Sequence, residues 1–74
     1  MTLETLLNTI EPYEQVLIIE GTVPFVDKHI YQGLNTYFLE FCRENKLHLM
    51  NRNVIKIEAG VNLIYIFIEK EKHQ

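Results

Sequence analysis

Few side chains in this sequence are of the types that carry out chemistry, and none has the spacing that a metal or catalytic site requires. Cys42 is the single thiol, and His29 and His48 are the imidazoles nearest to it along the chain. They form no CxxC or HxxxH pair, so their spacing does not indicate a metal site. A catalytic thiol also needs a positioned base and an activating environment. Cys42 is therefore interpreted as a small buried hydrophobe.

The other candidate chemistry is a carboxylate pair for acid–base catalysis. Glu11 and Glu14 flank Tyr13 in a predicted turn, but charges in turns are more commonly solvated. Gly21 and Gly60 are isolated turn glycines and belong to no phosphate-binding loop. The sequence thus predicts no catalytic residue, no cofactor-binding residue and no metal ligand, and the chain is interpreted as a protein that is not an enzyme.

Length and charge limit the classes of protein that remain. With 74 residues, of which 47% are hydrophobic and 23% charged, the chain fits one domain over residues 1–74. The formal net charge of −3 argues against direct binding of nucleic acid, which requires a broad basic face. A protein–protein interaction is the remaining class.

Cysteine usage and hydropathy predict where the protein acts. One cysteine allows no disulfide within the chain, which is typical of a cytoplasmic protein. The first residues lack the basic region of a signal peptide, and the longest apolar run is shorter than the roughly 20 residues that span a bilayer. We therefore expect a cytoplasmic protein with no membrane partner.

The elements are organised around the run 61–68, which is rich in β-branched and aromatic residues and is predicted to be the central strand of a small sheet. Both of its faces are apolar, so each face needs a cover. Leu63, Tyr65 and Phe67 point one way, and either the second helix or another chain covers them. Ile64, Ile66 and Ile68 point the other way.

Two helices are predicted as the covers, one on each face. Leucines at helical spacing predict the first helix, which Thr2 caps and which ends before Pro12. The run 15–20 is a predicted strand. From Asp27 to about Asn45 the spacing of apolar residues favours a second, longer helix with Asp27 as its cap.

The remaining sequence predicts either a short strand or an irregular return loop over 46–50, followed by a strand over 54–58. Ala59–Gly60 is the predicted two-residue turn into the central strand, which places Glu58 opposite Val61. The fold class is therefore α+β: a small, mainly antiparallel three- or four-stranded sheet with two helices, in the order α-β-α-(β)-β-β.

Both ends of the chain resemble a known group of proteins. The opening MTLETLLNTI with the strand 15–20, and the closing NVIKIEAGVNLIYI, are similar to the ends of small uncharacterised proteins of phages, prophages and integrative elements of Gram-positive bacteria. Those proteins typically join the two ends by a short loop, whereas here residues 24–50 insert a helix. The resemblance implies a role in the host bacterium, such as inhibiting or redirecting a host system, including anti-CRISPR inhibition.

The inserted helix carries the predicted partner-binding site. Leu39 is a large apolar residue on its polar face, and a central apolar anchor ringed by polar residues is how binding energy is usually concentrated. We therefore expect an unidentified host protein to bind there. The alternative is a structural or regulatory homo-oligomer without an external target. For either function we expect a homodimer, because both faces of the run 61–68 are apolar and two short helices leave part of them uncovered. The predicted site consists of Lys28, Gln32, Thr36, Leu39 and Arg43.

Overall fold

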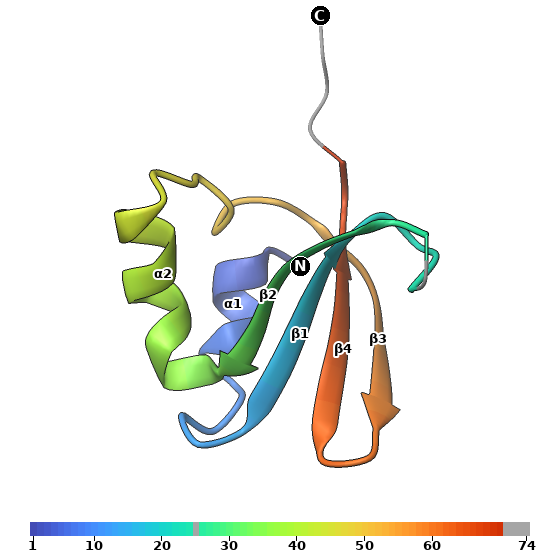
Figure 1. Ribbon diagram of the computed structural model, residues 1–74, viewed down its shortest axis with the longest axis horizontal. Coiled ribbons are helices and arrows are strands. Elements are labelled where there is room, and N and C mark those ends of the chain that lie inside the picture. The colour runs from blue at the N-terminus through green and yellow to red at the C-terminus, as the bar shows by residue number, and fades with distance from the viewer. Residues whose placement is uncertain (25, 71–74) are drawn as a thin grey trace, which may run out of the picture.

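The structure, a computed structural model, describes residues 1–24 and 26–70. In these residues the chain forms four strands and two short α-helices, which confirms the α+β class (Figure 1). A strand that was not predicted comes before the second helix, so the order is α-β-β-α-β-β. The elements are α1 (Leu3–Leu7), β1 (Gln15–Glu20), β2 (Lys28–Leu34), the 3-10 turn η1 (Asn35–Tyr37), α2 (Phe38–Glu44), β3 (Val54–Gly60) and β4 (Leu63–Ile68).

The sheet has the strand order β2-β1-β4-β3. β1 and β4 run parallel at its centre, and the two outer pairs are antiparallel. The apolar run that was predicted to be central is β4, and this prediction is confirmed. Ile66, Phe67 and Ile68 have no exposed surface, as expected for a strand paired on both edges and covered on both faces.

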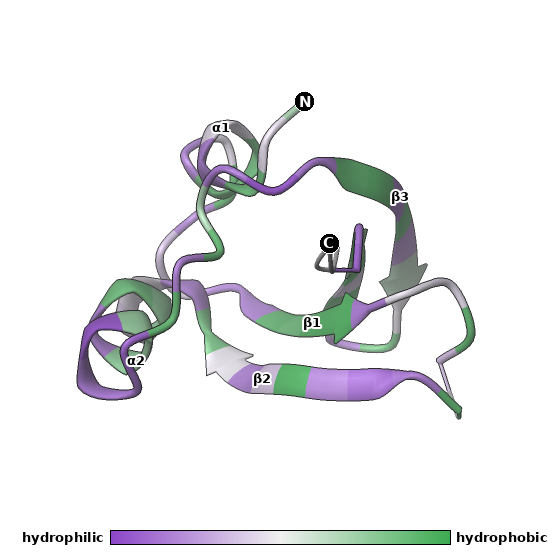
Figure 2. Ribbon diagram, turned by 90° about the horizontal axis from the view of Figure 1, so that it is seen from above, coloured by the Kyte–Doolittle hydropathy of each residue, from purple (hydrophilic) through white to green (hydrophobic). Residues whose placement is uncertain are grey.

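Both helices cover the same face of the sheet, so the prediction of one helix on each face is wrong. Leu3 of α1 and Phe38 of α2 belong to one buried cluster with Ile18 of β1 and Ile66 of β4. Figure 2 shows both helices on the same side of the molecule, with β3 on the other side. Neither helix alone is long enough to cover β1 and β4, so the two share this face.

The opposite face of the sheet carries a smaller buried cluster of Leu17, Ile19 and Phe67. No helix covers this face among the described residues; long side chains and a loop do so instead. Lys56 of β3 places its Nζ 4.5 Å from the centre of the Phe67 ring. His29, which pairs with Ile19, donates from its ring Nε2 to the Pro24 carbonyl in the β1–β2 loop. Phe67 is therefore buried within its own chain.

The helix predicted from Asp27 to Asn45 is wrong in its first half, where the chain forms β2. The apolar pair Ile30–Tyr31 concealed the strand, because a strand with one buried face normally alternates. Here Tyr31 pairs with Ile18 and His29 with Ile19, so Ile30 is an extra residue in a β-bulge. Ile30 and Tyr31 both pack on the helix-covered core, a pattern that resembles helical spacing.

Residues 46–50 form no strand and return irregularly from α2 to β3, which is one of the two predicted alternatives. The predicted turn at Ala59–Gly60 needs correction. The two-residue hairpin loop is Val61–Asn62, so that Gly60 pairs with Leu63 and Glu58 with Tyr65. Asn62 takes the left-handed conformation, with φ of 57°, which asparagine tolerates better than most residues. The turn lies two residues later than predicted. Because side chains on a strand alternate between its two faces, a shift of two residues leaves Ile57, Lys56 and Glu58 on the predicted faces.

Candidate protein-binding surface

The structure separates the five residues of the predicted partner site into two groups. Thr36, Leu39 and Arg43 lie on η1 and α2 and line adjacent grooves. Lys28 and Gln32 lie on β2, because that segment is a strand. Gln32 pairs with Leu17 on the face of the sheet that bears no helix. The prediction that all five residues share one helix face is therefore wrong.

Leu39 itself is placed as predicted. Its side chain is 47% exposed, whereas that of its neighbour Phe38 is fully buried in the core. The Phe38 ring lies 5.0 Å from the Tyr31 ring, centre to centre, and 6.2 Å from the Phe41 ring. These contacts fix the rotation of α2, so that Leu39 lies outside the core.

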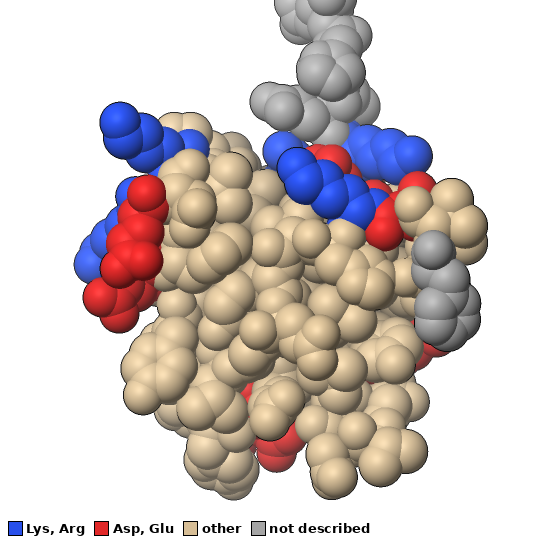
Figure 3. All heavy atoms as spheres, in the orientation of Figure 1, with Lys and Arg blue, Asp and Glu red and all other residues tan. Residues whose placement is uncertain are grey.

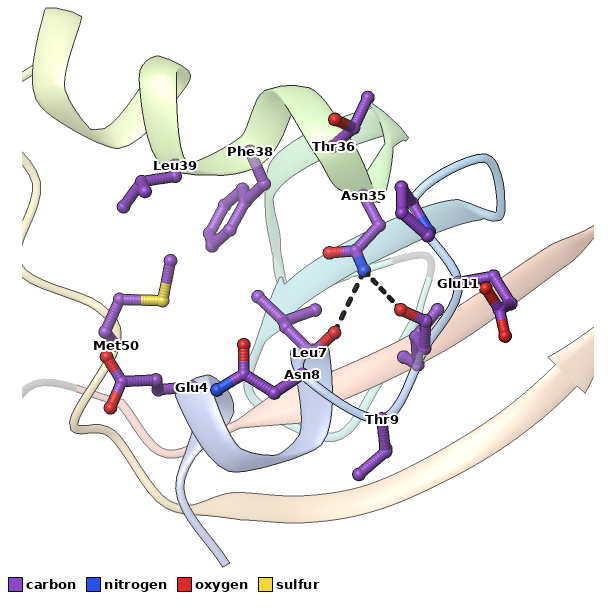
Figure 4. A pocket seen from close by; sticks show the side chains of 12 residues that line it. Glu4, Leu7, Asn8, Thr9, Glu11, Asn35, Thr36, Phe38, Leu39 and Met50 are labelled. Atoms are coloured by element: carbon purple, nitrogen blue, oxygen red, sulfur yellow. Dashed lines mark hydrogen bonds between the residues drawn. The ribbon is translucent and has the colours of Figure 1, made fainter.

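The first groove runs between α1 and α2 and has a volume of about 420 Å³. Figure 4 shows Leu39 of α2 and Met50 of the return loop pointing toward one another at one end of this groove. Its charged residues are both acidic, Glu4 and Glu11. The full lining is Glu4, Leu7, Asn8, Thr9, Ile10, Glu11, Pro12, Asn35, Thr36, Phe38, Leu39 and Met50.

Asn35 holds the two walls of this groove together. Its Nδ2 donates hydrogen bonds to the carbonyl oxygens of Leu7 and Ile10, both at 3.0 Å (Figure 4). The backbone N–H of Thr36 donates to the Pro12 carbonyl at 3.0 Å. These bonds hold η1 against the C-terminal end of α1 and the turn that follows it. The bonds therefore fix the position of η1 relative to α1 and shape the groove.

The second groove lies on the other side of Leu39, between α2 and residues 46–51, and has a volume of about 600 Å³. Its lining among the described residues contains no Asp or Glu but includes the basic residues Arg43 and Lys46. The lining is Leu39, Cys42, Arg43, Lys46, Leu47, His48, Leu49, Met50 and Asn51.

A Schellman motif closes α2 and shapes this groove. The N–H of Leu47 donates to the Cys42 carbonyl at 2.9 Å, and that of Lys46 to the Arg43 carbonyl at 3.3 Å. Lys46 has φ of 55°, a left-handed conformation that glycine usually occupies at this position. The reversal brings Leu47 and Leu49 back along α2, where Leu49 is buried in the core.

Leu39 and Met50 line both grooves and form the wall between them. We call the two grooves with this wall the Leu39 surface. Figure 3 shows charged side chains gathered over α2 and along the rim where β1 and β4 end, with an uncharged area over the strands between them. The Leu39 surface has Leu39 and Met50 at its centre, an acidic groove on one side and a basic groove on the other. Sequence analysis missed Met50 and Asn35, because nothing local marks them.

Cys42, Glu11 and Glu14 are candidate chemical groups of the sequence whose surroundings the structure describes. Burial raises the pKa of the Cys42 thiol, which keeps it protonated and unreactive near neutral pH. In the described residues no three His, Cys, Asp or Glu side chains come close enough together to hold a metal ion. Glu11 and Glu14 are joined by a turn in which the Glu14 N–H donates to the Glu11 carbonyl at 3.1 Å.

A second polar cluster that sequence analysis missed ties the strand ends together. The Arg52 guanidinium forms an ion pair with Glu20 at the end of β1, and its Nη1 also donates to the Glu69 carbonyl at 3.2 Å. Lys28 lies beside this cluster and lines a shallow hollow with Glu20 and Arg52. Because the charges are paired, this cluster has a structural role at the edge of the core.

Comparisons of the chain with protein-family models, curated proteins and solved structures found no match. Within residues 1–24 and 26–70, none of the helices has the length and apolar character needed to cross a membrane. The assignment of function therefore rests on the Leu39 surface.

Proposed function

We propose that the chain is a small non-catalytic protein-binding module that inhibits or modulates a protein of the bacterium in which it is made. The observation that carries the proposal is the Leu39–Met50 wall, an apolar ridge that lies between two preformed grooves. Binding energy at protein interfaces is typically concentrated in such an apolar centre, surrounded by polar residues that exclude water. The resemblance of the chain ends to phage and prophage proteins supports a host-directed role, with anti-CRISPR inhibition as one form of it.

The charges of the grooves suggest the chemistry of the partner. Glu4 and Glu11 line the first groove, and Arg43 and Lys46 line the second. A partner segment with apolar residues over the ridge, basic residues over the first groove and acidic residues over the second would be complementary to both. Such complementarity raises specificity and association rate more than affinity.

The experiment that tests the proposal is affinity capture from a lysate of the host, with mass spectrometry of the retained proteins. The immobilised chain is compared with Leu39→Glu and with Val26→Glu, a matched charge change at a side chain that is 80% exposed in the β1–β2 loop. We expect at least one protein to be retained by wild type and Val26→Glu but lost with Leu39→Glu. Equal retention of every protein by all three chains would contradict the proposal.

The same experiment separates this function from a homo-oligomer without an external target. A homo-oligomer of that kind would retain only copies of itself, and the Leu39 surface would have no external occupant. Loss of a host protein with Leu39→Glu alone is not expected for such a protein.

A further inference from the structure

The outer edge of β3 is the most exposed apolar part of the described sheet. Ile55 is 46% exposed, Ile57 47% and Val61, in the adjoining loop, 92%. Ile57 pairs with Ile66 on the helix-covered face, but the helices pack on β1 and β4 and leave Ile57 open. A long apolar edge strand is a template for pairing with another chain, and proteins normally protect it.

The N-terminus protects only the start of this edge. Thr2 forms a bridge to Asn53, and the N–H of Val54 donates to the Met1 carbonyl at 2.8 Å. In the part of the chain that the structure describes, no strand pairs with the outer side of 55–60. We call this segment the β3 edge.

The hairpin determines which backbone groups of the β3 edge are free to pair. The loop Val61–Asn62 has two residues, so Gly60 and Leu63 form the hydrogen-bonded pair beside it. Every second residue from Gly60, including Glu58, then directs its N–H and C=O toward β4. Ile57 and Ala59 direct theirs away from β4, to solvent.

We propose that a second copy of this chain pairs with the β3 edge, antiparallel and about a two-fold axis at Ile57. This axis places the outward N–H and C=O of Ile57 opposite the same groups of the other copy, as a hydrogen-bonded pair requires. It also places Lys56 of each copy opposite Glu58 of the other copy, which gives two cross-strand pairs. In each chain Lys56 Nζ lies 2.9 Å from Glu58 Oε1, so the charges of the four side chains alternate both along and across the two strands.

The charges select this register over its neighbours. An axis at Glu58 would place two carboxylates opposite each other, and an axis at Lys56 would oppose two ammonium groups. The regular part of the pairing spans Lys56 to Glu58, because the β3–β4 register shifts between Val54 and Lys56, and Met1 occupies the edge at Val54. The interface is isologous and separate from the Leu39 surface, so Leu39→Glu should leave it intact.

The test uses two charge variants, Lys56→Glu and Glu58→Lys, in sedimentation equilibrium at high micromolar concentration. Wild type should sediment as a dimer. Each variant alone should self-associate roughly tenfold more weakly, because two attractive cross-strand pairs become repulsive. An equimolar mixture should associate at least as tightly as wild type, since acidic and basic edges then face each other, and this recovery also shows that both variants fold.

Ile57→Pro provides a second test, because proline is tolerated on an edge strand where the lost N–H faced solvent. It should be folded and monomeric. A monomeric wild-type chain at high micromolar concentration would overturn the proposal. Charge variants that dimerise as tightly as wild type, or a mixture that associates no better than its components, would overturn it as well.

Discussion

Asp27 shows how a single residue can end one element and start another. Its Oδ2 accepts hydrogen bonds from the backbone N–H groups of Thr22 and Val23, both at 2.8 Å. The carboxylate therefore closes the loop between β1 and β2, where it was expected to cap a helix. Gly21 allows this arrangement, because it has φ of 124° and a Cβ there would lie 2.2 Å from Oδ2.

We predict that Asp27→Asn lowers stability at neutral pH and that the difference from wild type shrinks in acid. The hydrogen bonds from Val23 and Thr22 lower the pKa of Asp27 below its ordinary value. A lowered carboxyl pKa stabilises the fold above the ordinary value, about 3.9, and this contribution is lost as pH falls through the folded-state pKa. Urea melts of both chains from neutral pH to pH 3 measure the effect. A difference that stays constant with pH would exclude the carboxylate charge as its cause.

A second prediction at this scale concerns the neighbours Phe38 and Leu39. Phe38→Ala should lower the free energy of unfolding by about 3–5 kcal/mol, because it leaves a cavity among Tyr31 and Phe41. Leu39→Glu should change it by less than about 1 kcal/mol, since an exposed glutamate suits a helix. Urea melts monitored by circular dichroism compare the two. Unfolding of Leu39→Glu would place Leu39 in the core and remove the proposed binding surface.

At the scale of elements, α2 ends in a conformation that its sequence does not favour. A non-glycine residue in the left-handed region costs roughly 1 kcal/mol, and Lys46 occupies that region at the end of the Schellman motif. We predict that Lys46→Gly stabilises the chain by about 0.5–1 kcal/mol. The matched control is Asn45→Gly, at a residue with φ of −98°, which should not stabilise. In thermal melts, Lys46→Gly should have a higher melting temperature than wild type and Asn45→Gly should not. A lower melting temperature for Lys46→Gly would contradict this account.

The central position of β4 gives a prediction for its core residues. Ile66→Ala should cost about 2–5 kcal/mol, because Ile66 is fully buried between α1 and the neighbouring strands. Ile55→Ala, at a half-exposed residue of β3, should cost less than about 1 kcal/mol. Urea melts at low protein concentration measure both without a contribution from self-association. Similar losses from the two variants would mean that β4 is not the central strand.

Comparison with the sequence shows which elements local pattern determines. β4 was predicted because both of its faces are apolar, and β1 because it is a β-branched run that ends at Gly21. The burial of Ile18, Ile19, Ile66 and Phe67 agrees with both predictions. β2 was missed because the bulge at Ile30 removes the alternation that marks a strand. Gly33 was a clue, since a glycine disfavours a helix and here lies against the hydroxyl end of the Tyr31 side chain.

The binding surface was predictable only where it depended on one helix. Leu39 and Arg43 lie on α2, and Thr36 lies one turn earlier on η1, so helical spacing placed them together. Asn35 donates a hydrogen bond to Leu7 of α1, and Met50 lines the first groove together with Glu4 of α1, so both contribute beside residues that are distant in the sequence. Lys28 and Gln32 were assigned to the surface because the error in β2 extended the helix too far.

At the scale of the whole molecule, the sheet keeps two interaction surfaces apart. The Leu39 surface lies over the helices, whereas the β3 edge lies at the far side of the sheet (Figures 1 and 2). Two β3 edges joined about a two-fold axis would leave both Leu39 surfaces open. The dimer would then present two copies of the site, which raises the avidity for a partner that is itself dimeric.

The most direct test of the account is a titration of the isotopically labelled chain with the host protein that affinity capture identifies, followed by the amide resonances of every residue. The account predicts the largest changes over α2, residues 46–51 and the end of α1, with little change along β3. Changes confined to β3, or to the face of the sheet around Leu63 and Tyr65, would contradict the central claim that the Leu39 surface binds the partner.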